Sequence, residues 1–249
     1  MLNIFELAVI GGLVSFASTA LGSFGYTLFQ KSGPAEQLRN SIDFALGIML
    51  SAAAFSLIGP EILGAWSDDH KLTLVLGALA TGMIFISLTQ KVATVFRGSA
   101  KSANNSARWL LATTLLIHNF PEGMGAGASL AGMPSLQAIP IQLAIIVQNL
   151  AEGFLMVLCL KSMGLSTIKS IVGGLVSGLV ECFGALLAGS ALTFSLNLLP
   201  LFLAAAGGAM VMSVLIEIKE ALSEGRTLSV QQMFLGLITI PILNLTLGA

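Results

Sequence analysis

The sequence predicts an all-α integral membrane protein with eight transmembrane helices and both termini on the extracytoplasmic side. Three observations lead to this prediction: the scarcity of charge, the spacing of the apolar runs and the one-sided distribution of basic residues. Of the 249 residues, 55% are hydrophobic and 9% are charged, and the mean hydropathy is +0.93. Soluble domains carry roughly 25% charged residues, so this composition excludes a soluble enzyme, a nucleic-acid-binding protein and a disordered chain.

Eight apolar runs are long enough to cross a bilayer, which takes about 20 residues of helix. They cover 7–29, 44–63, 72–90, 109–130, 140–160, 170–192, 198–218 and 230–249. The connections between them leave no room for a soluble domain, so residues 1–249 are predicted to form a single transmembrane domain. No Lys or Arg precedes the first run, which indicates a retained span rather than a cleaved signal peptide.

The basic residues set the predicted orientation. Ten of the eleven Lys and Arg residues fall in the connections after the first, third, fifth and seventh runs. Only Lys71 falls on the opposite side. Because cytoplasmic connections carry the excess of Lys and Arg, the side with ten basic residues is predicted to be cytoplasmic. An even number of spans then leaves both termini outside.

Polar groups inside the runs carry the functional information. The fourth run contains HNFPEG at 118–123, the fifth contains QNLAEG at 148–153, and the sixth contains Glu181. An ionisable residue at the centre of a membrane helix costs about 2.5–3.5 kcal/mol. No Lys or Arg lies inside any run to pair with these carboxylates. Protonation, bound cations or both must therefore compensate for the three glutamates.

Helical spacing favours bound cations. Residues i, i+1 and i+4 share one face of a helix, so each of the two segments presents its first, second and fifth side chains together. Both segments lie near the middle of antiparallel spans, where these faces can meet. One imidazole, three carboxylates and three amide oxygens form the predicted ligand set: His118, Asn119, Glu122, Gln148, Asn149, Glu152 and Glu181. Such a set suits a borderline divalent metal, including zinc.

Each of these residue types, taken alone, has a simpler explanation. A single His, Asn or Gln in a span is explained by hydrogen bonding between helices, and a single Glu by a proton relay. The repetition of the pattern in two consecutive runs is what favours a metal site.

The HNFPEG segment resembles the signature of the ZIP family (Zrt/Irt-like proteins) of metal transporters, and QNLAEG is similar to the companion motif in that family's next helix. The segment from Phe44 to Glu61 resembles the family's second helix, and the segment from Ala204 to Glu220 resembles its seventh. The resemblance extends over the whole chain.

The resemblance also implies how the ligands are divided. In the bacterial branch that carries a glutamine in its site, the primary ion would be held by one set of five residues: His118, Glu122, Gln148, Glu152 and Met49 from the second run. A second, adjacent ion would be held by another set: Asn119, Glu122, Asn149, Glu152 and Glu181, with two glutamates bridging the ions. Many members of the family carry His where this chain has Gln148.

The function implied by the resemblance is uptake of divalent ions into the cytoplasm, passively or along a gradient. Zinc is the expected cargo, with Fe²⁺, Mn²⁺ and Cd²⁺ as alternatives. The family further implies a moving four-helix transport unit, a homodimer and, for a bacterial member, the inner membrane. No catalytic cofactor and no nucleic-acid partner are expected.

Two other functions stay open at this stage. An intramembrane metalloenzyme would need an open metal position with a water and a general base, but the chain has no H-E-x-x-H segment. A proton-coupled solute carrier would use Glu122 and Glu152 as proton relays. A repeated motif on antiparallel helices is typical of a symmetric passage site, so a transporter without enzymatic activity is the preferred interpretation.

Overall fold

The computed structural model describes residues 2–28, 34–97, 103–223 and 225–247. This described part of the chain is 92% helix and contains no strand. The prediction of an all-α protein is therefore confirmed. The physical reason is that no water in a bilayer core can bond to exposed backbone groups, so each spanning segment pairs its own N–H and C=O groups by forming a helix.

The helices follow one another with short connections, and each predicted apolar run coincides with one continuous helical segment. The segments are α1 (Ile4–Gly25), α2 (Pro34–Ala52) with a π-helical turn (Ala53–Ile58) and α3 (Gly59–Ala65), α4 (Asp69–Arg97), α5 (Ala103–Gly132), α6 (Ser135–Ser162), α7 (Thr167–Phe194), α8 (Leu199–Ser223) and α9 (Val230–Leu247). The π-helical turn ends where the N–H of Gly59 bonds to the carbonyl of Ala54, five residues back. Pro60 follows, and it has no N–H with which to continue the α-helical ladder.

Among the described residues, six segments are long and apolar enough to cross a membrane. They are Ile4–Leu28, Ser41–Ala65, Asp69–Val92, Gln137–Ser162, Thr167–Phe194 and Leu196–Ser223, with a shorter apolar helix at Val230–Thr246. α5 falls outside this set, and it is the helix that carries the polar HNFPEG segment. The multi-span character is confirmed for these six helices, whereas the total of eight spans and the extracytoplasmic termini stay predictions.

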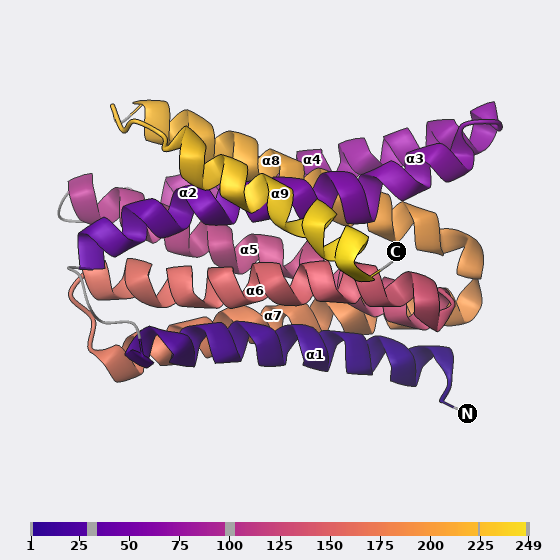
Figure 1. Cartoon of the computed structure of the whole chain (residues 1–249), viewed down its shortest axis with the longest axis horizontal. Helices are drawn as coiled ribbons and strands as arrows, with labels where there is room; N and C mark the ends of the chain where they lie inside the picture. The colour runs from indigo at the N-terminus through magenta and orange to yellow at the C-terminus, as the bar shows by residue number, and fades with distance from the viewer. Residues whose placement is uncertain (1, 29–33, 98–102, 224, 248–249) are drawn as a thin grey trace.

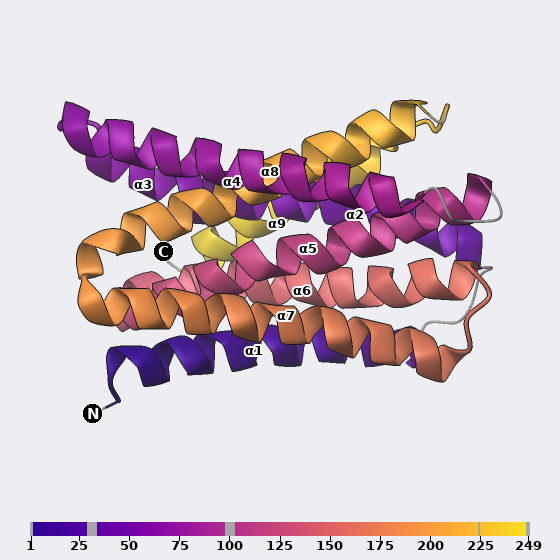
Figure 2. The same cartoon turned by 180° about the vertical axis from the view of Figure 1, so that it is seen from behind.

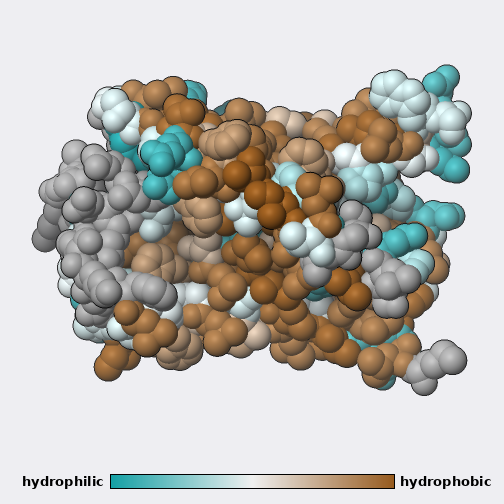
Figure 3. Space-filling view, in the orientation of Figure 1, coloured by the Kyte–Doolittle hydropathy of each residue, from teal (hydrophilic) through white to brown (hydrophobic). Residues whose placement is uncertain are grey.

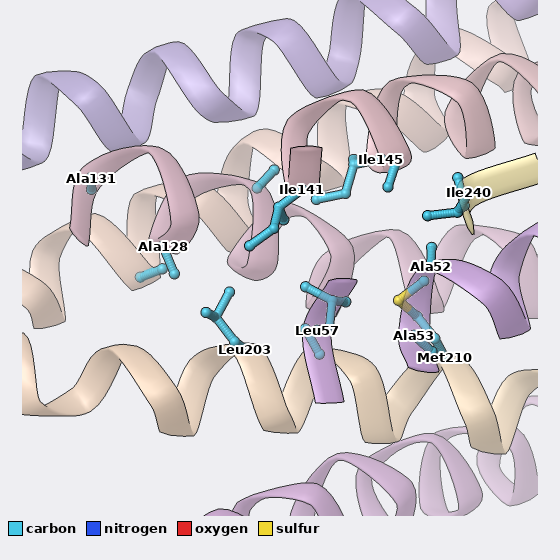
Figure 4. Packing of buried hydrophobic residues seen from close by; sticks show 14 of the residues in the cluster. Ala52, Ala53, Leu57, Ala128, Ala131, Ile141, Ile145, Leu203, Met210 and Ile240 are labelled. Atoms are coloured by element: carbon cyan, nitrogen blue, oxygen red, sulfur yellow. The ribbon is translucent and has the colours of Figure 1, made fainter. Parts of the chain in front are cut away.

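The helices pack as two bundles that lie side by side (Figures 1 and 2). The first bundle contains α1, α5, α6 and α7, and the second contains α2, α3, α4, α8 and α9. α5 packs against α8, and α2 packs against α6, across the boundary between them. An apolar cluster at this boundary draws Leu57 and Met210 from the second bundle and Ile141 and Ile145 from the first (Figure 4).

The surface of the molecule fits a bilayer environment. Figure 3 shows apolar residues across the middle of one face, with hydrophilic residues gathered toward the two ends of the long axis. Large hydrophobic side chains on α4 are exposed, among them Leu74, Ile84 and Leu88. Exposed apolar surface of this extent is typical of a protein whose middle section is surrounded by lipid.

Glycines on both partners bring four helix pairs into backbone contact. The reciprocal pairs are Gly22 and Gly153 in α1 and α6, Gly47 and Gly236 in α2 and α9, Gly82 and Gly208 in α4 and α8, and Gly123 and Gly184 in α5 and α7. A Cβ atom on Gly82 would lie 1.9 Å from the carbonyl oxygen of Ala205. Small residues at such crossings let membrane helices gain van der Waals contact in place of a hydrophobic driving force.

One buried ion pair holds an end of the second bundle. Asp43 of α2 is fully buried, and its carboxylate accepts hydrogen bonds from Nη1 of Arg226 at 2.7 Å and from the backbone N–H of Ser229 at 2.8 Å. The sequence analysis found no basic residue inside the apolar runs and did not anticipate this pair, because Arg226 reaches Asp43 from the connection between α8 and α9. The pair ties α2 to the start of α9.

We expect Gly82→Ala to lower the stability of the purified protein by about 1–3 kcal/mol, since the added methyl overlaps the backbone of α8. Gly77→Ala on the same helix is the matched control, because a Cβ at Gly77 would meet nothing within 4 Å. Thermal unfolding in detergent measures both variants. Equal unfolding temperatures for the two variants would contradict the close crossing of α4 and α8.

We expect Arg226→Met to destabilise the chain by about 3–5 kcal/mol, because it leaves the buried Asp43 carboxylate without its cation. The double variant Asp43→Leu with Arg226→Met removes both charges and should unfold at a higher temperature than Arg226→Met alone. A double variant less stable than the single one would show that the pair does not behave as a coupled buried unit.

Candidate metal centre

α5 and α6 bring the two repeated segments face to face inside the first bundle. His118 and Glu122 come from α5, and Gln148 and Glu152 come from α6; each of the four is at most 3% exposed. One ligand atom each from His118, Glu122 and Glu152 lies within 4.8 Å of the other two. The one-turn spacing within each helix places the imidazole, the amide and the two carboxylates around a common point.

The distances within this cluster suit a small cation. Nε2 of His118 lies 3.0 Å from Oε2 of Glu152 and 3.7 Å from Oε1 of Glu122. Ligand atoms at about 2.1 Å from a tetrahedral ion are about 3.4 Å apart, a value between these two distances. The amide Nε2 of Gln148 donates to Oε1 of Glu152 at 2.8 Å and also to Oε1 of Glu122. The spacing of the imidazole and the carboxylates therefore matches that of ligand atoms around a small divalent ion, while the nitrogen of the Gln148 amide, and not its oxygen, faces the carboxylates.

Several polar atoms of the predicted ligands have no hydrogen-bond partner among the described residues. These buried atoms are Nδ1 of His118, Oδ1 of Asn119, Oε2 of Glu122, Oε1 of Gln148 and Oδ1 of Asn149. Buried polar atoms without a partner are uncommon and call for an explanation, such as a bound ion. Here they gather on five of the residues that the sequence analysis selected.

Glu181 of α7 lies beside the asparagines and is fully buried. Its Oε1 accepts hydrogen bonds from the Thr19 hydroxyl and from Nδ2 of Asn119, and its Oε2 accepts from the Ser15 hydroxyl and from Nδ2 of Asn149. The Asn119 amide also donates to the Ser177 hydroxyl at 3.0 Å. The structure therefore brings Glu181 to Asn119 and Asn149, with both of its oxygens engaged by protein donors.

Met49 comes from the second bundle. It lines a small cavity of about 20 Å³ together with His118 of α5 and Ser213 and Glu217 of α8. The cavity has room for about one water molecule and lies on the His118 side of the cluster.

α1 carries a row of buried hydroxyl residues that the sequence did not single out, and two of them, Ser15 and Thr19, donate hydrogen bonds to Glu181. Ser15, Ser18, Thr19 and Ser23 are all at most 3% exposed and lie on one helical face of the first run. The other three follow Ser15 by three, four and eight positions, and this spacing places their hydroxyls along one side of a helix. A helical projection of the first run would have shown this row. It was overlooked because hydroxyl residues are common in membrane helices and none is ionisable.

The exposed acidic group between α3 and α4 has a capping role. Asp68 accepts hydrogen bonds from the backbone N–H groups of Lys71 and His70, both at 3.1 Å. The hydrogen bond from the Lys71 N–H, followed by the Lys71 charge, lowers the pKa of the Asp68 carboxyl. His70, the second histidine of the chain, is exposed in the first turn of α4 and does not belong to the His118, Glu122 and Glu152 cluster.

Comparison with known proteins finds no family model that matches the chain. Over 222 residues the chain is 33% identical to the zinc transporter ZIPB of Bordetella bronchiseptica, and the match covers 85% of this chain and 71% of that protein. A shorter match of 108 residues is 38% identical to the zinc transporter GufA of Myxococcus xanthus and covers 43% of this chain and 42% of that protein.

Proposed function

This chain belongs to the ZIP family of metal transporters, and from that premise we propose that it carries divalent transition-metal ions, zinc foremost, through a multi-pass membrane domain into the cytoplasm. The named activity of both bacterial relatives is zinc transport. Transport rather than catalysis is the function of such proteins, which argues against the metalloenzyme alternative. Fe²⁺, Mn²⁺ and Cd²⁺ are rival cargoes for the same ligands.

The buried cluster of His118, Glu122, Gln148 and Glu152 is the observation that supports this proposal most directly. Two carboxylates and one imidazole meet in the interior of the first bundle, and within the described part of the chain no Lys or Arg forms an ion pair or hydrogen bond with them. One divalent ion would neutralise Glu122 and Glu152 together. The Gln148 amide now donates to both carboxylates, so it would turn over to offer its Oε1 atom to the ion. Imidazole nitrogen and carboxylate oxygen are accepted zinc ligands.

Met49 is the ligand that would couple binding to movement. The other members of the primary site lie on α5 and α6 in the first bundle, whereas Met49 lies on α2 in the second. Sliding of the first bundle along the second would break only the thioether contact and would carry the ion with the remaining ligands. A thioether also favours softer ions over manganese.

The position of the small cavity beside the cluster supports release toward the cytoplasm. His118 and Met49 line it, and Glu217 of α8 contributes to the same lining. Glu217 lies near the end of α8, and Arg226 lies in the connection that follows. This connection is one of the four that are rich in basic residues, and these are predicted to be cytoplasmic. A bacterial inner membrane and a homodimer complete the proposal, and the bacterial origin of ZIPB and GufA supports the former.

We expect Glu122→Ala and Glu152→Ala each to abolish nearly all zinc uptake into proteoliposomes, because each removes a charged ligand of the primary site. Asp69→Asn is the matched control: it neutralises an exposed carboxylate in the first turn of α4 and should leave uptake unchanged. Zinc entry is followed with a fluorescent indicator inside the vesicles. Full uptake by a correctly inserted Glu152→Ala variant would disprove the assignment of this site.

We expect Gln148→His to lower the KM for zinc several-fold while changing the KM for manganese little, because imidazole nitrogen binds zinc better than an amide oxygen does. The maximal rate should fall, since an ion that binds more tightly leaves the site more slowly. Uptake kinetics with both ions measure the effect. Equal changes in the two KM values would mean that Gln148 only bridges Glu122 and Glu152 by hydrogen bonds.

The same vesicles test the alternative that the chain is a proton-coupled solute carrier. Uptake of a panel of divalent ions at two external pH values should show saturable zinc entry in the absence of any organic solute. A chain that moves no divalent ion at either pH would leave Glu122 and Glu152 as proton relays.

A further inference from the structure

We propose that Glu181 is a positioning residue that orients Asn119 and Asn149, and not a metal ligand, so that the centre holds one ion. This inference rests on the proposed function, because it concerns the number of ions in the same site. It differs from the expectation drawn from the family resemblance, in which Glu181 joins a second ion.

Protein donors already occupy the lone pairs of the Glu181 carboxylate. A carboxylate offers about four acceptor positions on its two oxygens. Ser15 and Asn149 fill those of Oε2, and Thr19 and Asn119 fill those of Oε1. Glu181 is fully buried, so water does not compete for these positions. A metal could bind Glu181 only by displacing a donor, which would leave a buried hydroxyl or amide unpaired.

The same bonds determine which atom each asparagine presents to the ion. A carboxylate only accepts hydrogen bonds, so it draws the Nδ2 group of both amides and turns their Oδ1 atoms away. Nδ2 of Asn119 is shared between Glu181 and Ser177, and Nδ2 of Asn149 is shared between Glu181 and Ser15. Both Oδ1 atoms are buried and have no partner among the residues that the structure describes.

Those two oxygens stand next to the primary ligands in the chain. Asn119 follows His118, and Asn149 follows Gln148. In this arrangement Glu181 acts on the ion through the amides. Ser15 and Thr19 hold the carboxylate from α1, so donors from α1, α5 and α6 meet on one residue of α7.

The substitution Glu181→Gln separates orientation from ligation. The amide nitrogen of the new glutamine replaces one oxygen of the carboxylate. It faces one hydroxyl and one asparagine amide, both of which donate to that oxygen in the wild-type chain. The hydroxyl can rotate and accept a hydrogen bond, but the asparagine must flip to do so. Its Nδ2 group would then point toward the ion in place of Oδ1. We expect the Kd for zinc to rise about tenfold, the lower end of the effect seen when a residue supporting a metal ligand is changed.

The test measures zinc bound to the full chain in nanodiscs. The number of ions lost on Glu152→Ala defines the occupancy of the centre, and we expect one. Glu181→Gln should keep that one ion with the weaker Kd. In a background of Asn119→Ala with Asn149→Ala, the same substitution should have no further effect on Kd, which a purely structural role would not predict.

Thr19→Val supplies an independent variant that keeps the side-chain shape and removes one donor to Glu181. It should weaken zinc binding several-fold. Ser23→Ala is its matched control, because the Ser23 hydroxyl donates only to the backbone carbonyls of Thr19 and Gly153. We expect no change in the Kd of this control.

Two ions lost on Glu152→Ala, or one ion lost on Glu181→Gln, would overturn this inference and leave the proposed function standing. So would a Glu181→Gln effect of the same size in the background without the two asparagines. A wild-type chain that binds no zinc would overturn the proposed function itself, and this inference with it.

Discussion

The arrangement of this protein depends on one constraint: three carboxylates are buried in a helical bundle, and no Lys or Arg is among the hydrogen-bond and ion-pair partners that the described residues give them. Each must be compensated, because an uncompensated charge in such a place costs several kcal/mol. Glu181 is compensated by four protein donors. Glu122 and Glu152 share the Gln148 amide and face His118, and this leaves Oε2 of Glu122 without a hydrogen-bond partner among the residues that the structure describes. The Glu181 carboxylate is thus fully engaged by protein donors, whereas that of Glu122 is not.

Backbone contact between helices makes these hydrogen bonds possible. A Cβ atom on Gly123 would lie 1.9 Å from the carbonyl oxygen of Glu181, and one on Gly184 would lie 2.0 Å from that of Phe120. The short side chains of Asn119 and Ser177 can therefore bridge α5 and α7 around Glu181. The crossing of α1 and α6 at Gly22 and Gly153 does the same for Ser15 and Asn149. Larger residues at these crossings would move the polar atoms out of hydrogen-bond range.

The residues of the proposed centre are divided between the two bundles. The paired motifs and the Glu181 network all lie in the first bundle, so in the proposed transport cycle their mutual geometry would persist while that bundle moved as a unit. The second bundle contributes Met49 and most of the lining of the small cavity beside His118. The contact between the bundles is largely apolar, through Leu57, Ile141, Ile145 and Met210 (Figure 4). Apolar contacts are non-directional, a property compatible with the sliding proposed above.

The sequence by itself determined the helical segments, the family and the pairing of His118 and Glu122 with Gln148 and Glu152. These features follow from local rules: apolar length, the one-turn spacing of ligands and the repetition of a motif on consecutive antiparallel helices. Only the tertiary structure decided that Glu181 is saturated by Ser15 and Thr19, and that Asp43 pairs with Arg226. Those partners lie more than 160 residues apart in the chain, and periodicity specifies which face of a helix is polar but not which helix it meets. The rotation and crossing point of each helix, set here by glycine contacts, selected the partners.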